Sequence, residues 1–586
     1  MATFTELARE FIVESFELDP LEATNAGVHS QDARWPDWSA PGIERQLEFC
    51  ERWLARLVAL PTPTLTADEA IDRERLLLQV DDRRFEAGEM GQDAWDPLIW
   101  VYRLGDGLFP LIAREFAPPA ERLASIAGRL EGIPAVVAAA RERLGALDGV
   151  PVSRLHTDIA LRNFSGVDDL IGEALGLADT NASEPEVAVL RTRLDTAAET
   201  ARAALGELRT HLRRTVLRKA EGEGRLGRDR FAARLRRTFS DPSISPDDVL
   251  AAAETDYPAV RGEMMRIARE LWPEWCPDRA MPDDEGALVR AVCDAIAGDH
   301  PAADELLDAS RAELVRIEAF CRERELIGLT DEPLQIQWTP IFLRPFAGAM
   351  LHSPGPFDRG QKAFFSITPP DPTWPPERVE SMLREHNQRQ LRLLTIHEAV
   401  PGHYLQGVYG NRNPSLVRSV YGDGVYAEGW AVYVTQVMLD EGFDADDPAL
   451  LLMNWKYYLR AVVNAIIDVR IHVHGMTRDE AISLMVDGAF QELSEATGKW
   501  DRARLSSTQL STYFIGARVM WDLEDEARRR AAVASGDPRG EAAVPKPRIL
   551  GGYGTTPGFL YRRHLESVLS GGELPLPLLR RALFGG

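Results

Sequence analysis

The segment Thr395–Gln406, which reads TIHEAVPGHYLQ, constrains the fold of this chain more than any other. Helical zinc sites commonly use the motif H-E-x-x-H, in which two histidines one turn apart hold the metal and the glutamate acts as a general base. Here His403 follows His397 by six positions, and in a straight helix the two side chains would point about 120° apart. Pro401 removes a helical N–H group and Gly402 accepts backbone angles that other residues avoid. We therefore expect the helix to break there and return His403 to the side of His397.

A catalytic zinc site needs three protein ligands and one open position for water. The run Val425–Tyr433 offers one carboxylate, Glu428, in apolar and aromatic surroundings. A carboxylate buried without a partner costs several kcal/mol, so this position calls for a metal, a cation or a proton. We predict that His397, His403 and Glu428 hold one Zn²⁺ per chain, although this donor set also suits other divalent transition metals.

Glu398 follows the first histidine and points elsewhere around the helix. In zinc hydrolases a glutamate at this position takes a proton from the attacking water and passes it to the leaving amine. We predict that Glu398 is the general base. It could instead be a structural partner of an arginine such as Arg392, and the bent motif could belong to a binding module that no longer loads metal.

The length of 586 residues is too great for a single core and indicates two domains or two large lobes. From Phe4 to about Arg324, apolar residues return every three to four positions, as in successive amphipathic helices. Between Gly328 and Pro376 prolines crowd together and two short runs alternate like β-strands. We predict a mainly α, two-lobed fold with an N-terminal helical lobe (residues 1–325), a C-terminal metal-binding lobe (residues 326–586) and a small β element beside the cleft between them.

The expected elements can be given by range. Examples of the helices expected before Arg324 are Ile43–Leu60, Glu121–Leu147, Glu184–Arg218, Pro246–Leu271 and Ala302–Arg324. The helices expected after Pro376 are Glu377–Leu394, Tyr426–Leu439, Leu450–His472, Arg478–Glu492, Ser506–Arg530 and one around Gly558–Leu569, and the expected strands are Gln335–Phe342 and Lys362–Thr368.

The run from Arg209 to Arg237 is the one basic region of a chain whose formal net charge is −24. A site for nucleic acid or another anionic partner would look like this. It lacks the interleaved aromatic residues of single-strand binding, having only Phe231. We favour a solvated helix face paired with the surplus acids, and the net charge argues against general nucleic-acid binding.

The four cysteines show no C-x-x-C spacing, and the residues from Met1 to Glu6 lack the basic-then-apolar layout of a secretory signal. No uninterrupted apolar stretch approaches the ~20 residues that a membrane helix needs. The closest, Ala461–Val469, is cut by Asn464 and Asp468. We predict a cytoplasmic protein that is not embedded in a membrane, and the sequence leaves its oligomeric state open.

Four further blocks accompany the first motif. They are Y-A-E-G-W-A from Tyr426, an R…D…H block from Arg460 through Asp468 to His472, Q-L-S-T-Y-F-I-G from Gln509 to Gly516, and S-V-L-S-G-G-E-L-P-L-P-L-L from Ser567 to Leu579. With these blocks the chain resembles the bacterial domain-of-unknown-function family 885, which is similar to gluzincin-type zinc metallopeptidases. The resemblance covers nearly the whole chain and is strongest after Thr395. Arg470 stands where that family usually has glycine, and Ser507-Thr508 replace Pro-Gly, which puts substrate preference in doubt more than the metal.

The resemblance implies the helical two-lobed fold of angiotensin-converting enzyme, thimet oligopeptidase and carboxypeptidase Taq, whose deep cleft admits short peptides. It also implies a tyrosine or histidine that stabilises the oxyanion, for which Tyr513 and His472 are the candidates. Arg460 could bind a substrate carboxylate, and Asp468 could orient His472 or a metal ligand. The alternatives are that Tyr513 and His472 are ordinary core residues and that Arg460 and Asp468 form a structural ion pair.

The sequence thus predicts a zinc metallopeptidase that cleaves short peptides. Hydrolysis of another amide remains an alternative, because zinc-activated water does not itself select a peptide. A metal-free binding module of the same fold and an anion-binding scaffold working through Arg209–Arg237 are the alternatives from other classes.

Overall fold

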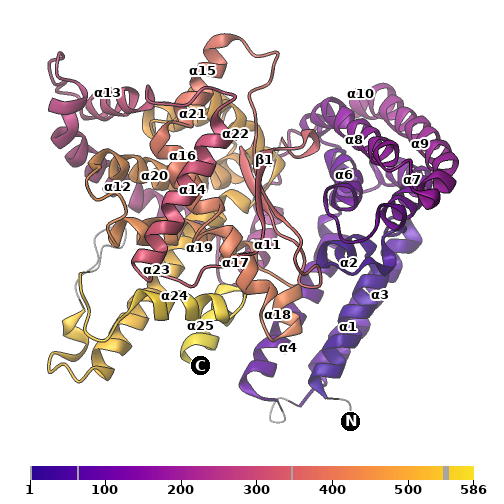
Figure 1. Ribbon diagram of the computed structural model, residues 1–586, viewed down its shortest axis with the longest axis horizontal. Coiled ribbons are helices and arrows are strands. Elements are labelled where there is room, and N and C mark those ends of the chain that lie inside the picture. Colours follow the sequence, from indigo (N-terminus) through magenta and orange to yellow (C-terminus); the bar gives the residue numbers. More distant parts are fainter. Residues whose placement is uncertain (1–2, 62–64, 345–347, 545–553, 586) are drawn as a thin grey trace.

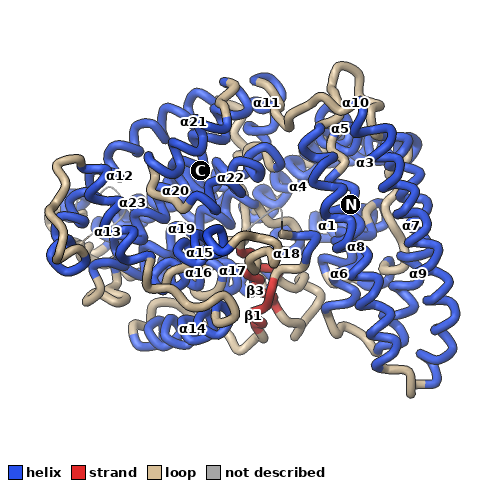
Figure 2. Tube along the Cα trace, turned by 90° about the horizontal axis from the view of Figure 1, so that it is seen from above, coloured by secondary structure: helices blue, strands red, loops and turns tan. Residues whose placement is uncertain are grey.

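The computed structural model describes residues 3–61, 65–344, 348–544 and 554–585, and it is mainly α-helical with one small mixed sheet. The helices of the first 220 residues lie on one side of the sheet, and most of the later helices lie on the other (Figure 1). Seen from above, the strands again lie between these two groups (Figure 2). The sheet therefore marks the junction between an N-terminal part and a larger second part.

The N-terminal part has two large hydrophobic clusters, besides a small one formed by Phe85, Met90 and Trp95. One joins α1, α3 and α4, and it also receives side chains of α18 from the second part. The other fills the space among α6, α7, α8 and α9. The helices of this part are α1 (Phe4–Leu18), α2 (Pro20–Ala26), α3 (Ala40–Val58), α4 (Ala67–Phe85), α5 (Gln92–Trp95), α6 (Leu98–Ala113), α7 (Pro119–Arg143), α8 (Arg154–Thr180), α9 (Pro185–His211) and α10 (Leu217–Lys219).

Helix α7 is long and apolar enough to cross a membrane by length and composition, and it is the one such helix in the described part of the chain. More than half of its apolar window is buried, and it packs along α9. Two arginines of this helix, Arg122 and Arg129, are buried and donate to the backbone carbonyls of Leu111 and Asp32. These contacts make α7 a core helix of the N-terminal part.

The second part is built around one large hydrophobic cluster, to which nearly all of its helices contribute. These helices are α11 (Arg228–Thr238), α12 (Pro246–Trp275), α13 (Glu285–Ala297), α14 (Leu306–Glu323), α15 (Pro376–Glu385), α16 (Gln388–Glu398), α17 (His403–Asn411), α18 (Leu416–Val420), α19 (Gly424–Asp440), α20 (Pro448–His474), α21 (Arg478–Ser483), α22 (Leu493–Leu505), α23 (Gln509–Ala534), α24 (Tyr561–Ser570) and α25 (Leu576–Phe584).

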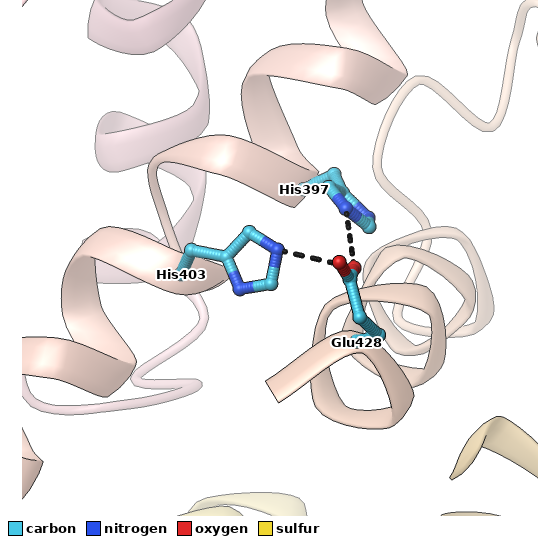
Figure 3. A group of neighbouring side chains, drawn as sticks. All are labelled: His397, His403 and Glu428. Atoms are coloured by element: carbon cyan, nitrogen blue, oxygen red, sulfur yellow. Dashed lines mark ion pairs between the residues drawn. The ribbon is translucent and has the colours of Figure 1, made fainter. Parts of the chain in front are cut away.

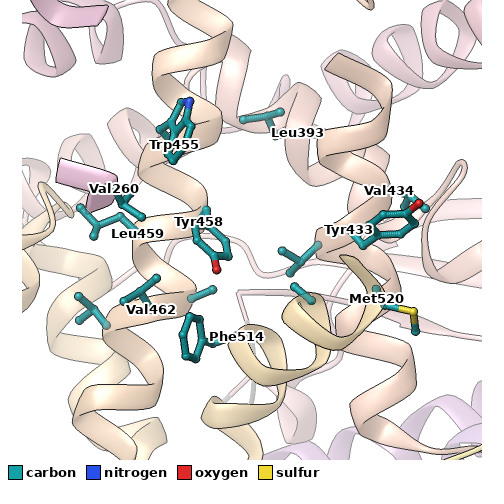
Figure 4. Packing of buried hydrophobic residues seen from close by; sticks show 14 of the residues in the cluster. Val260, Leu393, Tyr433, Val434, Trp455, Tyr458, Leu459, Val462, Phe514 and Met520 are labelled. Atoms are coloured by element: carbon teal, nitrogen blue, oxygen red, sulfur yellow. The ribbon is translucent and has the colours of Figure 1, made fainter. Parts of the chain in front are cut away.

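The large cluster includes residues from before position 325. Val260 of α12 packs with Leu459 of α20, near Leu393 of α16, Tyr433 of α19 and Phe514 of α23 (Figure 4). Helices α11 to α14 therefore share a core with the helices that carry the predicted metal ligands. The shared contacts cross the expected division at residue 325, which stays a prediction.

Several expected helices differ in their limits. The helix expected over Glu377–Leu394 is two helices, because Asn387 accepts a hydrogen bond from the backbone N–H of Gln390 and starts α16 anew. The helix expected over Arg478–Glu492 leaves α-helical geometry after Ser483. Helices α22 and α25 form in segments for which no helix was expected.

The sheet has the strand order β1-β3-β2. Strand β1 (Leu334–Trp338) pairs parallel with β3 (Ala363–Ile367), and β2 (Ala349–His352) pairs antiparallel with β3. The two expected strands thus exist, at slightly different limits, and β2 is an addition. Strand β3 is buried throughout, whereas β2 is a partly exposed edge strand.

Candidate metal centre

The helix that carries the first histidine ends just before Pro401-Gly402, the expected break, which we call the wedge. Helix α16 stops at Glu398 and α17 begins at His403, with a cis Val400–Pro401 peptide between them. The Gly402 N–H group bonds to the carbonyl oxygen of Ile396 at 3.1 Å. A Cβ atom at Gly402 would overlap the carbonyl oxygens of Ile396 and His397, so only glycine fits this close turn. The break brings the imidazole rings of His397 and His403 to a centroid distance of 4.7 Å.

Glu428 completes a group of three possible ligands (Figure 3). Its Oε2 atom lies 3.6 Å from Nε2 of His397 and 3.5 Å from Nε2 of His403. These distances are long for hydrogen bonds. Two ligand atoms that each lie about 2.0–2.1 Å from one tetrahedral ion are about 3.4 Å apart. Glu428 Oε2 is also buried without a hydrogen-bond partner among the described residues. The spacing and this unpartnered oxygen fit a divalent metal ion.

Contacts behind the ligands hold their orientation. The Nδ1 atom of His403 faces Oε1 of Gln406 at 3.4 Å, which leaves Nε2 directed at Glu428. Gln509 donates from Nε2 to Oε1 of Glu428 at 3.3 Å, so that Oε2 is the oxygen left for a metal. Partners of this kind fix the tautomer and direction of metal-binding side chains.

Helix α19 is fixed against both neighbouring elements. Its start is capped by Asp423, which accepts from the backbone N–H of Tyr426. The indole N–H of Trp430 donates to the carbonyl oxygen of Pro401 at 2.9 Å, which ties the helix to the wedge. Gly429 crosses Gly516 of α23 so closely that a Cβ atom on either would overlap backbone atoms. These contacts place Glu428 between α17 and α23.

The electrostatics of the group are those of charges removed from water. Burial disfavours the charged form of Glu428, but the two facing imidazoles hold the pKa of its carboxyl well below the usual range. Burial likewise opposes protonation of His403, yet the carboxylate of Glu428 raises its pKa to about 9. Without a metal, the group is therefore an ion pair in which a proton takes the place of the cation.

Glu398 lies beside the three ligands and is itself buried. Its Oε2 atom has no hydrogen-bond partner in the described part of the chain. Burial raises the pKa of its carboxyl, opposed by His403 and His397. Arg392, the structural partner considered for it, instead pairs with Glu313 and Asp444. Glu398 is thus a buried carboxylate whose second oxygen remains available to a proton.

Tyr513 reaches the group from α23. Its hydroxyl accepts hydrogen bonds from Nη2 of Arg502 at 2.9 Å and from Nε2 of Gln509 at 3.1 Å. These donors fill the acceptor capacity of the hydroxyl, so its proton is left to donate toward a bound molecule. Burial raises the pKa of Tyr513 to about 12, against the opposing effect of Arg502, so the hydroxyl stays protonated at neutral pH.

Two cavities meet at this group. We call the first the large cleft: it has a volume of about 490 Å³ and is lined by His397, His403, Glu398 and Glu428 together with residues of β2, α17 and the C-terminal segment. We call the second the small pocket: it has a volume of about 80 Å³ and lies among α16, α20 and α22. Ala349, His397, Glu398, Arg502 and Tyr513 line both cavities. A molecule bound at the metal group would therefore extend into both.

Arg460 lines the small pocket, as a substrate-binding residue must. Its guanidinium lies 3.3 Å from Glu385 and 3.7 Å from Glu495, and it stacks over the ring of Tyr457. It does not pair with Asp468. Arg460 is thus near the site, but two carboxylates of the protein already face its charge.

His472 and Asp468 line neither cavity. His472 accepts at Nδ1 from the backbone N–H of Leu226 and donates from Nε2 to the carbonyl oxygen of Ala503. Asp468 accepts from the backbone N–H groups of Thr508 and Ser511, at the beginning of α23. The structure thus does not bring His472 to the metal group, and Asp468 acts on it at most through α23.

Among the side chains that line the site without having been predicted for it are those of Gln406, Lys499, Arg502 and Glu573. Gln509 also contacts the site, and its spacing of four residues from Tyr513 on a helix was the available signal. Glu573 comes from the C-terminal block, and burial raises the pKa of its carboxyl to about 7, against a hydrogen bond from Gln406. Lys499 and Arg502 stand on α22, where nothing in the local sequence separates them from solvent-exposed charges.

The arginine-rich run is largely engaged within the molecule. Arg225 and Arg230 donate to backbone carbonyls, and others pair with acids: Arg209 with Asp168, Arg228 with Asp247, Arg234 with Glu86 and Arg237 with Asp81. The pairing agrees with a helix face that balances acidic neighbours.

These observations define a helical protein of two parts whose larger part carries a buried His-His-Glu group suited to a metal ion. The chain belongs to the family described as "Bacterial protein of unknown function (DUF885)", whose pattern matches residues 20–583. It is similar in structure to "a putative lipoprotein of unknown function" from Shewanella oneidensis, with a TM-score of 0.77 and 29% sequence identity over 99% of both chains. A "putative lipoprotein" from Colwellia psychrerythraea also gives a TM-score of 0.77, at 16% identity over 99% of this chain and 98% of its own, which shows the fold alone. No curated protein matches the chain.

Proposed function

We propose that this protein is a zinc-dependent hydrolase, and specifically a metallopeptidase that cleaves short peptides. The observation that carries the proposal is the arrangement of His397, His403 and Glu428 at ligand spacing, with the unpartnered carboxylate oxygen of Glu398 beside them. The resemblance of the DUF885 family to gluzincin-type enzymes that the sequence led us to expect would imply the same chemistry, and the arrangement of two helical parts is compatible with their two-lobed fold.

The side chains supply the steps of an amide hydrolysis. A zinc ion held by His397, His403 and Glu428 would polarise the scissile carbonyl and lower the pKa of water. Glu398 accepts the proton of the attacking water and delivers it to the leaving amine. Tyr513 donates its hydroxyl proton to the oxyanion that develops on the scissile carbonyl. Gln509 and Arg502 hold that hydroxyl in place from behind.

A peptide substrate is favoured by the position of β2. Ala349, Met350 and Leu351 of this edge strand line the large cleft. An edge strand offers unpaired backbone N–H and C=O groups, to which an extended peptide can add as a further strand. This feature selects a peptide over other amides, because only a peptide repeats the same donor and acceptor pattern along its length.

Two glutamate variants test the proposal. Glu398→Gln keeps the three ligands, so we expect about one zinc per chain and a loss of at least ~100-fold in kcat on a mixture of short peptides. Glu428→Gln removes an anionic ligand, so we expect both zinc and activity to fall. Metal analysis by mass spectrometry and a peptide-library assay measure the two outcomes. Wild-type protein that binds no divalent metal, or a Glu398→Gln variant with full activity, contradicts the proposal.

The similarity to a lipoprotein bears on the cellular compartment of this protein. The neighbour at 29% identity is described as a lipoprotein, and we propose an association with the cell envelope in place of the cytoplasm predicted from the sequence. The four cysteines are free and buried, so the fold depends on no disulfide in either compartment. Fractionation of the producing bacterium tests this, and recovery only in the cytosolic fraction contradicts it.

A further inference from the structure

The small pocket beyond Glu398 is lined by three cationic side chains and by three carboxylates, one of which is Glu398 itself. Lys499, Arg502 and Arg460 line it, together with the carboxylates of Glu385 and Glu495. Glu385 is also bound by Lys456, which lies outside the pocket, at 2.9 Å. Glu385 is therefore shared between Lys456 and Arg460. A buried charge is costly unless it is paired, so the partners of each cation decide which of them can bind a further anion.

The cations differ in how well the protein satisfies them. Arg460 lies close to both Glu385 and Glu495. Lys499 is 4% exposed at its side chain and has a single partner, Glu495, at 3.3 Å. Arg502 donates hydrogen bonds to the neutral side chains of Gln509 and Tyr513, and its Nε atom is buried without a hydrogen-bond partner among the described residues, although the charges of Glu428 and Glu495 also act on it. Burial and the neighbouring Arg502 and Arg460 lower the pKa of Lys499 to about 7, against the effect of Glu495, so its ammonium form is only partly populated near neutral pH and a bound anion would stabilise it. Lys499 and Arg502 therefore have unused capacity to bind an anion.

The size and position of the pocket restrict that anion. The pocket begins at Glu398 and Tyr513, where the scissile amide would lie. One water requires about 10–15 Å³ of such volume, so 80 Å³ holds on the order of six waters. That room suits a carboxylate and a small residue but not a peptide that continues in both directions. The anion must therefore stand at the end of the chain.

We propose that the small pocket is a carboxylate subsite in which Lys499 and Arg502 bind the C-terminal carboxylate of the substrate, so that the protein removes residues from the C-terminal end. The inference rests on the proposed peptidase function and adds the direction of cleavage. It assigns this role to Lys499 and Arg502 in place of Arg460, whose guanidinium already lies near Glu385 and Glu495.

The test compares peptides that differ only at the C-terminus. We use N-acetylated trialanine as the free acid and as the amide, with zinc-loaded wild-type protein. A hydrogen bond to a charged group contributes about 1.5–3 kcal/mol, which corresponds to roughly 10- to 150-fold. We expect kcat/KM for the acid to exceed that for the amide by that factor. Equal values for the two peptides overturn the subsite.

Variants of two buried lysines assign the effect. Lys499→Met should reduce the acid-to-amide ratio about tenfold or more, and Lys499→Arg should restore most of it. Lys456→Met is the matched control, because Lys456 is equally buried and paired with one glutamate but does not line the pocket. It should lower stability and change the ratio much less than Lys499→Met does, because it acts on the pocket only through Glu385. If Lys456→Met and Lys499→Met change the ratio equally, the assignment to Lys499 is wrong.

Two further measurements test where on the substrate the carboxylate must lie and whether the pocket binds it without turnover. An amidated peptide that ends in glutamate carries its carboxylate on a side chain, and cleavage of it as fast as the free acid overturns the C-terminal assignment. Calorimetry of N-acetyl-dialanine and its amide with Glu398→Gln protein measures binding without turnover. If the acid binds more tightly than the amide, and this difference is lost in the double variant that also carries Lys499→Met, the subsite is established. If the same protein then cleaves no peptide in its wild-type form, the proposed function alone fails. Equal binding of the two ligands rejects the subsite.

Discussion

Two buried histidine–carboxylate groups lie in the second part of this molecule, and their hydrogen bonds distinguish them. In the candidate metal centre, Oε2 of Glu428 lies 3.5 Å from Nε2 of His403 and 3.6 Å from Nε2 of His397. This oxygen has no hydrogen-bond partner among the described residues. In the second group, backbone groups satisfy both ring nitrogens of His472, and Asp468 caps α23. Both groups combine histidine with a carboxylate, so the unsatisfied polar atoms, rather than the kinds of side chain, indicate a ligand site.

The two groups also shift histidine pKa values in opposite directions. The facing carboxylate of Glu428 raises the pKa of His403 to about 9 in spite of burial. Burial lowers the pKa of His472 to about 4, since Asp468 directs its oxygens to the start of α23. His403 is therefore a cation in the first group, whereas His472 is a neutral ring in the second. The following predictions test this contrast.

The largest effect is expected at the wedge. Gly402→Ala places a Cβ atom against the carbonyl oxygens of Ile396 and His397, so the turn must open and His403 must move. Since changes behind a ligand already reduce metal affinity by about 10- to 100-fold, displacing a ligand should reduce zinc affinity by about 100-fold or more. Competition with a chromogenic chelator measures the affinity.

Gly424→Ala provides the control for that variant. Gly424 is the first residue of α19, and a Cβ atom there meets nothing within 4 Å. This variant should bind zinc as the wild type does. Unchanged zinc affinity in Gly402→Ala would show that the wedge has another purpose.

The second effect concerns acid stability and belongs to His472. Its pKa in the folded protein, about 4, lies below the ordinary 6.5, so the unfolded chain binds a proton that the folded chain does not. The stabilising contribution is complete above pH 6.5 and is lost as the pH falls toward 4. A shift of this size corresponds to about 3 kcal/mol in the free energy of unfolding. Urea unfolding of zinc-free protein between pH 7.5 and 4.5 measures the loss.

His472→Gln isolates this contribution. The other buried histidines titrate in both proteins, so the difference in their pH dependence belongs to His472. We expect the variant to be less stable at pH 7.5 and to lose less stability than the wild type on acidification. Parallel curves for the two proteins would mean that His472 does not remain neutral in the fold.

The contrast between the groups also shows what the sequence could reveal. The wedge and the ligand Glu428 could be predicted from the sequence. The six-residue spacing of the two histidines required a break in the helix, and the apolar surroundings of Glu428 required a partner for its charge. His472 and Asp468 resembled site residues, because a local motif does not show that Leu226 and Ala503, far apart in the chain, satisfy the ring. Strand β2 has four residues and too short a pattern to identify. The small pocket depends on charges from separate helices, which only the packing brings together.

The third effect concerns Gln509, which contacts both Glu428 and Tyr513. Gln509→Ala leaves the three ligands in place but frees Oε1 of Glu428, so we expect zinc affinity to fall about 10- to 100-fold. Gln491→Ala is the control, because that buried amide lines neither cavity. Equal zinc affinity of the two variants would show that Gln509 does not orient the ligand.

The smallest effect compares the starts of α17 and α23. Gly402 provides the residue that its turn requires, whereas Thr508, before α23, has a φ angle of +68°, in the left-handed region that β-branched residues avoid. Both Thr508→Gly and Thr508→Ala remove the hydrogen bond between its hydroxyl and that of Thr238, but only glycine also relieves the backbone. The glycine variant should therefore be more stable than the alanine variant by about 1 kcal/mol, the reverse of the usual order. Thermal unfolding measures the difference, and greater stability of the alanine variant would show that Thr508 is not strained.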